Sequence, residues 1–268
     1  MVQPRDDRYL LDNRHTLAGR RLDALSELFD PWTSRHVEAL GIAPGWHCWE
    51  VGAGGPSVVR WLAAQVGPGG RVLATDIDLA WVQHATGPAV EVRRHDLVAD
   101  VPPDESFDLV HARLVLVHLA DRAAALGALV GALRPGGWLL VEDADPALQP
   151  LSCLDPRSPE EELANRLRTG FRSLLSGRRA DLAYGRTLPR LLRQAGLVDV
   201  GADAYFPVAL PACVELEVTT MAMIRDDLVR HGIATDEEID GHVAAARAGR
   251  LDLTQPPMIS AWGRAPGP

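Results

Sequence analysis

The sequence contains no lysine, because all 27 of its basic residues are arginine. Schiff-base chemistry, phosphate binding by a P-loop and the Tyr/Lys pair of short-chain dehydrogenases each require a lysine ammonium group. The absence of lysine therefore excludes these three kinds of chemistry.

Cysteine is also sparse. The three cysteines, Cys48, Cys153 and Cys213, show no CxxC spacing, which argues against a disulfide framework and against a structural zinc site. The chain has no uninterrupted apolar run of about 18 residues, the length that a membrane span needs. Its charged first 14 residues are followed by no apolar run, unlike a signal peptide. We therefore expect no membrane contact and place the protein in the cytoplasm.

The charge balance is acidic, with 27 basic against 36 acidic residues and a net charge of −9. This is the wrong sign for a protein whose affinity comes from the phosphates of nucleic acid or from an anionic membrane. We therefore expect a small-molecule partner rather than nucleic acid. A homodimer is compatible with this composition. The length of 268 residues and the 47% hydrophobic content fit one large α/β domain with a smaller appendage.

The first half of the chain divides into two parts. Residues 1–43 are expected to form a helical N-terminal extension, with one helix over 16–29 and a second that begins at Asp30-Pro31 and stops at Gly41. Residues 44–143 alternate between strands and helices, which predicts a doubly wound α/β core with a mostly parallel sheet. The strands are expected at 47–52, 71–75, 90–94, 107–112 and 138–143, and the helices at 57–66, 78–84 and 121–133.

The second half interrupts this alternation. Residues 144–185 are expected to form a cap insertion, and residues 186–268 return to the core with a helical insertion at 207–256. Insertions at the ligand edge of such sheets commonly shape a substrate pocket. The expected strands are 198–204 and 258–262, and the expected helices are 159–175, 186–195, 212–231 and 236–248.

The strongest local signal is the turn Glu50-Val51-Gly52-Ala53-Gly54-Gly55-Pro56, between the first strand and a helix. Glycines there let the backbone approach a ligand closely, and the helix N-terminus supplies free amide donors. The third glycine of the dinucleotide fingerprint is replaced by Ser57, and Glu50 stands just before the turn. A carboxylate beside this loop suits an ammonium group better than a pyrophosphate.

Two further acids follow the next strands. Asp76 comes 24 residues after Gly52, where such folds place a carboxylate on ribose hydroxyls. Asp96, after the third strand, is positioned to accept the exocyclic amine of an adenine, with Leu97 against the ring. Arg113, at the end of the fourth strand, either lines the ligand site or pairs with an acid.

Taken together, these motifs resemble the class I S-adenosylmethionine-dependent methyltransferases in their order and spacing. The resemblance is closest over 44–143 and rests on the glycine turn, Asp76, Asp96 and the Leu133–Gly137 turn. It implies a seven-stranded sheet whose last strand is reversed, with S-adenosylmethionine as the cofactor. The cofactor-binding residues that we expect are Glu50, Gly52, Ala53, Gly54, Asp76, Ile77, Asp96, Leu97 and Arg113.

The place after the fourth strand reads His111-Ala112-Arg113. It lacks the Asn/Asp-Pro-Pro-aromatic motif of enzymes that methylate DNA bases or glutamine. It also lacks the carboxylate that metal-dependent catechol methyltransferases carry there, so no metal is expected. The chain is therefore most similar to methyltransferases that modify quinones and secondary metabolites, and oxygen is favoured slightly over carbon or nitrogen as the acceptor.

His118, in Leu116-Val117-His118-Leu119, is the candidate base for removing a proton from a hydroxyl acceptor. It resembles the histidine of small-molecule O-methyltransferases, although Leu119 replaces their usual Asp. Tyr9, Asp143 and Tyr184 are candidate substrate contacts.

Two alternatives remain open from the sequence. One is a cyclase, isomerase or decarboxylase that uses bound S-adenosylmethionine as a scaffold, since fold does not dictate chemistry. The other is a nicotinamide-dependent oxidoreductase, which shares the glycine turn and the acid after the second strand.

Overall fold

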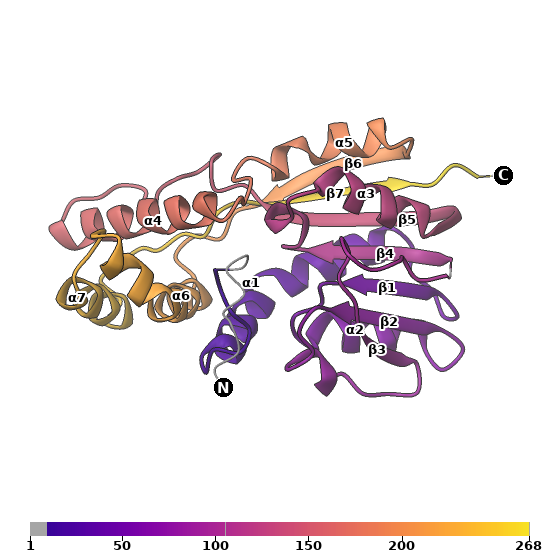
Figure 1. Cartoon of the computed structure of the whole chain (residues 1–268), viewed down its shortest axis with the longest axis horizontal. Coiled ribbons are helices and arrows are strands. Elements are labelled where there is room, and N and C mark those ends of the chain that lie inside the picture. The colour runs from indigo at the N-terminus through magenta and orange to yellow at the C-terminus, as the bar shows by residue number, and fades with distance from the viewer. Residues whose placement is uncertain (1–9, 105, 268) are drawn as a thin grey trace.

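A seven-stranded sheet forms the centre of the computed structural model, which describes residues 10–104 and 106–267 (Figure 1). Its strand order is β3-β2-β1-β4-β5-β7-β6. The pairs among β1 to β5 are parallel, whereas β7 is antiparallel to both of its neighbours. The predicted doubly wound sheet with one reversed strand is thus confirmed. The strands are β1 (His47–Val51), β2 (Arg71–Asp76), β3 (Val90–Arg94), β4 (Phe107–Arg113), β5 (Leu133–Ala144), β6 (Val198–Tyr205) and β7 (Met258–Arg264).

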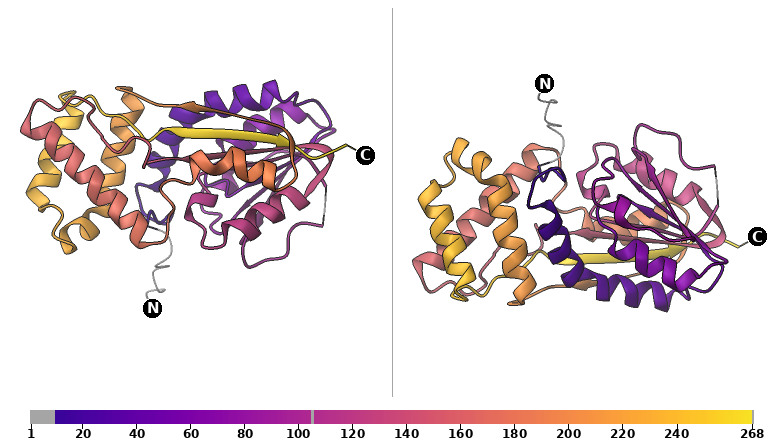
Figure 2. Two further views of the ribbon diagram at one scale, coloured as in Figure 1. Left: turned by 90° about the horizontal axis from the view of Figure 1, so that it is seen from above. Right: turned by 90° about the horizontal axis from the view of Figure 1, so that it is seen from below.

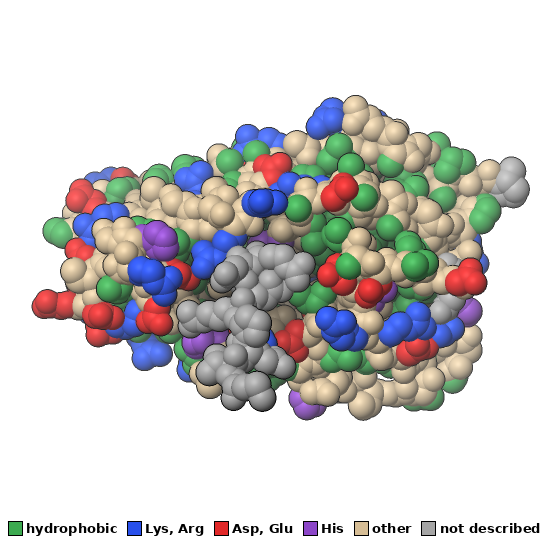
Figure 3. Space-filling model, viewed as in Figure 1, with side chains coloured by type: hydrophobic (Ala, Val, Ile, Leu, Met, Phe, Trp, Pro, Cys, Tyr) green, Lys and Arg blue, Asp and Glu red, His purple; other side chains and the backbone are tan. Residues whose placement is uncertain are grey.

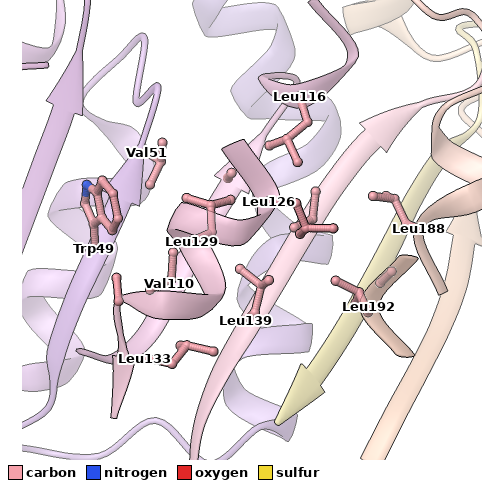
Figure 4. Close-up of a cluster of buried hydrophobic side chains, with 14 of the residues drawn as sticks. Trp49, Val51, Val110, Leu116, Leu126, Leu129, Leu133, Leu139, Leu188 and Leu192 are labelled. Carbon is pink, nitrogen blue, oxygen red and sulfur yellow. The ribbon is translucent and has the colours of Figure 1, made fainter. Parts of the chain in front are cut away.

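Helices cover both faces of this sheet, as Figure 2 shows. On one face, α3 and α5 pack on side chains such as Trp49, Val110 and Leu139 (Figure 4). On the other face, α2 and the second half of α1 pack on Cys48, Leu109 and their neighbours. The α-helices are α1 (Ala18–Ala39), α2 (Ser57–Val66), α3 (Arg122–Gly131), α4 (Pro159–Gly177), α5 (Leu188–Gln194), α6 (Pro211–Arg230) and α7 (Asp236–Arg247), and the short 3-10 helices are η1 (Val82–His84), η2 (Leu116–His118) and η3 (Gly185–Thr187).

A second body of helices stands at one end of the sheet, where α4, α6 and α7 pack together (Figures 1 and 2). Leu167 and Ile224 lie in its core. On its surface, acidic and basic side chains are interspersed, as Figure 3 shows for one face, and ion pairs such as Arg166–Glu238 join its helices. None of the helices in the described ranges has the length and hydropathy needed to cross a bilayer.

The first half of α1 packs against this helical body and the second half against the sheet. The prediction of two helices separated at Pro31 is wrong, because α1 runs unbroken through that residue. Proline has no N–H, so the carbonyl of Glu27, four residues earlier, loses its helical hydrogen bond. Both residues are exposed, and water can satisfy that carbonyl. Burial of Leu28 and Val37 on the two sides of the proline favours one continuous helix.

Two other local predictions differ from the structure. The helix expected over 78–84 is reduced to η1, because Asp78 accepts a hydrogen bond at Oδ1 from the amide of Ala80 and closes an Asx turn instead. The helix expected to reach Leu133 ends at Gly131. Leu133 already pairs with Phe107 in the sheet, so the predicted Pro-Gly-Gly turn lies inside β5.

Candidate active site

A cavity of about 280 Å³ lies where the sheet, α1 and the helical body meet. Its wall is built from α1, the turn between β1 and α2, the ends of β2 and β4, η2, α4, α6 and the segment that leads into β7. These segments run from Leu11 to Met258, so distant parts of the chain share one wall. The ends of parallel strands are where α/β proteins place ligands.

The turn between β1 and α2 forms one side of the cavity, and its shape depends on glycine. Gly52 and Gly54 have φ angles of +59° and +60°, a region that side chains disfavour. A Cβ atom on Gly52 would lie 2.4 Å from Val115 Cγ2. The backbone therefore comes close to its surroundings here, and the turn presents peptide groups to the cavity.

Asp76, at the end of β2, holds this turn in place and also lines the cavity. Its Oδ2 accepts a hydrogen bond of 2.8 Å from the amide of Gly54, and its Oδ1 accepts one of 2.9 Å from Asp78. Burial raises the pKa of Asp76 above its ordinary value, although these amides oppose the change. The next residue, Ile77, is 48% exposed and faces the cavity, where it offers an apolar surface beside a carboxylate.

The third predicted cofactor segment lies only partly in the cavity wall. His95 and Leu97 line the cavity, but Asp96 does not. The Oδ1 of Asp96 accepts hydrogen bonds of 3.0 Å and 3.3 Å from the amides of Val98 and Ala99. Contact between Asp96 and a cofactor therefore stays a prediction.

Glu50 does not line the cavity. It is only 3% exposed, and its Oε2 lies 2.6 Å from Nδ1 of His111 on β4. The other ring nitrogen of His111, Nε2, lies 3.2 Å from Oε2 of Glu142 on β5. The carboxylate that we expected to face an ammonium group is therefore engaged within the sheet, and its role as a cofactor ligand stays a prediction.

These three residues belong to a polar row, which we define as Glu50, His111, Glu142, Ser260 and Asp203. Adjacent strands carry them on the sheet face under α1, because side chains alternate along each strand. Burial disfavours the charge of the imidazole, yet the two flanking carboxylates raise the pKa of His111 to about 9. At neutral pH the ring is therefore protonated and donates from both nitrogens.

The polar row also fixes α1. Thr33 donates a hydrogen bond to Glu142, and His36 Nε2 lies 2.8 Å from Oδ1 of Asp203. Arg113, at the end of β4, donates 2.9 Å and 2.7 Å hydrogen bonds to Thr33 and Asp30 of the same helix. Arg113 therefore both lines the cavity and pairs with an acid, the two roles that the sequence left open.

His118 lines the cavity at η2, as a base would need to do. Burial, together with the positive charges of Arg21 and Arg122, lowers the pKa of His118 to about 4. Its imidazole is therefore neutral at pH 7 and can accept a proton. Catalysis by His118 stays a prediction.

Of the three predicted substrate contacts, the two that the structure describes are not at the wall. Tyr9 lies outside the described residues. Asp143 and Tyr184 are buried behind the cavity, since Tyr184 packs in the core with Leu188 and Asp143 accepts a 3.3 Å hydrogen bond from the amide of Val117. Burial raises the pKa of both groups. These positions do not support direct contact with a substrate.

Sequence reasoning placed the insertions near the pocket but did not identify the residues that line it. The wall away from the glycine turn includes Arg21, Phe171, Leu216 and Thr220, from three different helices. Each lies on a helix, and the sequence alone does not show which part of a helix faces a ligand. Among the described residues, no three His, Cys, Asp or Glu side chains are grouped so that they could hold a metal ion.

Comparison with known proteins identifies the central part of the chain. A family model described as a methyltransferase domain matches residues 49–141, the region that holds the glycine turn, Asp76 and the polar residues of β4. Residues 49–141 therefore carry a methyltransferase domain. The resemblance inferred from the sequence is thus confirmed.

The methyltransferase domain has relatives with different named acceptors. A phosphoethanolamine N-methyltransferase of Triticum aestivum is 28% identical over 177 residues, which cover 64% of this chain and 32% of the relative. A ubiquinone/menaquinone biosynthesis C-methyltransferase of Hahella chejuensis is 27% identical over 128 residues, 45% of this chain and 51% of the relative. The match with this chain thus spans about a third of the first relative and about half of the second.

Solved structures support the fold. The Haemonchus contortus phosphoethanolamine N-methyltransferase 2, in complex with phosphomonomethylethanolamine and S-adenosylhomocysteine, aligns with a TM-score of 0.60 and 16% identity. The alignment covers 98% of this chain and 61% of that chain. At this identity the likeness concerns the arrangement of helices and strands.

Proposed function

We propose that the protein transfers the methyl group of S-adenosylmethionine to a small molecule bound in the cavity, with an oxygen atom as the acceptor. The observation that carries this proposal is the junction of two unlike surfaces in one cavity. A glycine turn fixed by Asp76 forms one side, and apolar side chains of α1, α4 and α6 form the other. One side suits an adenosyl group, and the other suits an apolar acceptor.

The residues at the glycine turn fit this cofactor. Gly52, Ala53 and Gly54 line the cavity with backbone and small side chains, and the contact with Val115 leaves no space for a larger residue at Gly52, so this turn suits the methionine end. Asp76 has two carboxylate oxygens at the cavity, and a carboxylate accepts from adjacent ribose hydroxyls better than a neutral group does. Ile77 offers an apolar surface to an adenine ring.

S-adenosylmethionine supplies an electrophilic methyl group on a sulfonium. The chain must hold the acceptor in line with that group, exclude water and take up the proton of a hydroxyl acceptor. The apolar wall contributes the first two effects. His118 contributes the third, because its neutral imidazole lies at the cavity and its Nδ1 or Nε2 accepts the proton as the new bond forms.

Calorimetry with S-adenosylhomocysteine tests the cofactor site. We expect the wild-type protein to bind it, and Asp76→Asn to weaken binding about tenfold or more, because a hydrogen bond to a charged group is worth roughly 1.5–3 kcal/mol. Asp104→Asn removes the same charge at an exposed position outside the cavity and is the matched control. Binding of NADH in place of S-adenosylhomocysteine would instead support an oxidoreductase.

Transfer itself is tested with S-adenosylmethionine that carries a tritiated methyl group and a set of phenols and enols. Label in the acceptor, with one S-adenosylhomocysteine formed per methyl group, supports transfer. His118→Gln is expected to reduce kcat without changing affinity for S-adenosylhomocysteine, whereas His84→Gln, at an exposed position on η1, leaves both unchanged. Conversion of an acceptor without label or S-adenosylhomocysteine would favour a cyclase, isomerase or decarboxylase.

A further inference from the structure

Arg21, on the first turn of α1, lines the acceptor side of the cavity. His118, the candidate base, lines the same cavity, and the positive charge of Arg21 contributes to the lowered pKa of His118. The Nε of Arg21 is buried and has no hydrogen-bond partner among the described residues. A buried donor without a partner costs free energy, of the order of 1–3 kcal/mol. The cavity therefore holds an arginine with one buried donor, Nε, that is not used.

The charges in the described part of the cavity wall also indicate that Arg21 lacks an acidic partner there. Asp76 is the only acid among the described lining residues, and it lies beside the glycine turn rather than among the helices of the acceptor side. The other arginine in the wall, Arg113, already has a carboxylate partner in Asp30. Arg21 thus leaves a positive charge on the acceptor side that no acid among the described lining residues balances.

Apolar side chains such as Leu25, Phe29, Phe171 and Leu175 make up much of the wall that Arg21 shares, together with polar ones such as Thr220. Apolar side chains do not solvate a charge, so direct pairing with the guanidinium would stabilise an anion bound in this part of the cavity. Arginine and a carboxylate match in shape and make two parallel hydrogen bonds. One guanidinium balances one negative charge, which favours a carboxylate over a doubly charged phosphate monoester.

We propose that the methyl acceptor is an apolar molecule with a carboxylate, and that Arg21 binds this carboxylate beside His118. This inference rests on the proposed function, because it concerns the acceptor of the same cavity. It assigns Arg21 to substrate recognition: the ion pair fixes one end of the acceptor, and its apolar body packs against α4 and α6.

The test compares para-coumarate with its methyl ester, which has the same phenol and ring but no charge. Calorimetry first establishes whether S-adenosylhomocysteine binds, and both probes are then titrated with and without it. We expect wild-type protein to bind para-coumarate about tenfold to a hundredfold more tightly than the ester, the range that a charge-assisted hydrogen bond provides. Arg21→Gln is expected to remove this preference, and Arg21→Lys to retain part of it.

Arg20→Gln is the matched control, because Arg20 is adjacent on α1 but is exposed and paired with Glu215. It should keep the full preference for the acid. Equal binding of acid and ester by the wild type, no detectable binding of the acid, or an unchanged preference in Arg21→Gln would each overturn the proposal. Since the probes are also titrated alone, failure of S-adenosylhomocysteine to bind would count against the proposed function and not against the anion site.

Discussion

Raising the pH should destabilise the protein through His111. Its pKa lies at about 9 in the folded state, against an ordinary value of 6.5, because Glu50 and Glu142 flank a ring that solvent does not reach. The raised value means that the folded state holds this proton more tightly than the unfolded state does. The stabilising effect is therefore complete below pH 6.5 and is lost as the pH rises through 9.

At about 1.4 kcal/mol for each pKa unit, the difference between these two values corresponds to about 3 kcal/mol. This is a large share of the roughly 5–15 kcal/mol that stabilises a typical folded protein. Urea unfolding measured from pH 6 to pH 10 gives the free energy of unfolding at each pH. A variant with Gln in place of Glu50, His111 and Glu142 carries no charge in this part of the polar row and should lose most of the dependence.

His47→Gln, at the exposed start of β1, is the control for loss of a histidine and should keep the wild-type dependence. A histidine NMR titration measures the pKa of His111 directly. A value at or below 6.5, or the same loss of stability between pH 6.5 and 9 in the triple variant as in the wild type, would refute the reasoning.

Three further predictions test the fold. Gly52→Ala should destabilise the protein by about 2–4 kcal/mol and impair cofactor binding, because residue 52 has a positive φ and the new Cβ would overlap with Val115. Gly41→Ala is the control, since residue 41 has a positive φ but open space around it, and it should cost about 1–2 kcal/mol. Thr235→Ala removes the capping box of α7, and urea unfolding should show a loss of about 1 kcal/mol. Leu129→Ala opens a cavity in the core under α3 and should cost about 3 kcal/mol, and a loss under 1 kcal/mol would contradict the packing described here.

Most of the sheet could be predicted from the sequence because its strands are short apolar runs bounded by turn residues. The prediction failed where tertiary packing outweighs a local signal. Pro31 predicts a helix boundary, but burial on both sides of it holds α1 together as one helix. The helix predicted over 78–84 failed for the opposite reason, since there a local interaction outweighs the apolar spacing. The side chain of Asp78 closes a turn where the spacing predicts a helix.

The residues of the site were likewise predictable where they form local motifs, and not where their position depends on tertiary packing. The glycine turn and Asp76 are local motifs, and the structure brings them together as expected. The contact between Glu50 and His111 was not predicted, because it depends on the register of β1 against β4 and on which sheet face α1 covers. Arg21 and Phe171 were missed because their approach to the cavity depends on how α1 and α4 pack.

The residues that line the cavity range from Leu11 to Met258 in the sequence, so no short segment of the chain forms the cavity alone. Contacts between residues so far apart in sequence close large loops, and they are expected to form late in folding. A ligand bound in this cavity contacts segments that are far apart in the sequence and stabilises their packing against one another. Its stabilising effect then applies to the molecule as a whole and reaches about 2.7 kcal/mol when the free ligand exceeds its Kd a hundredfold.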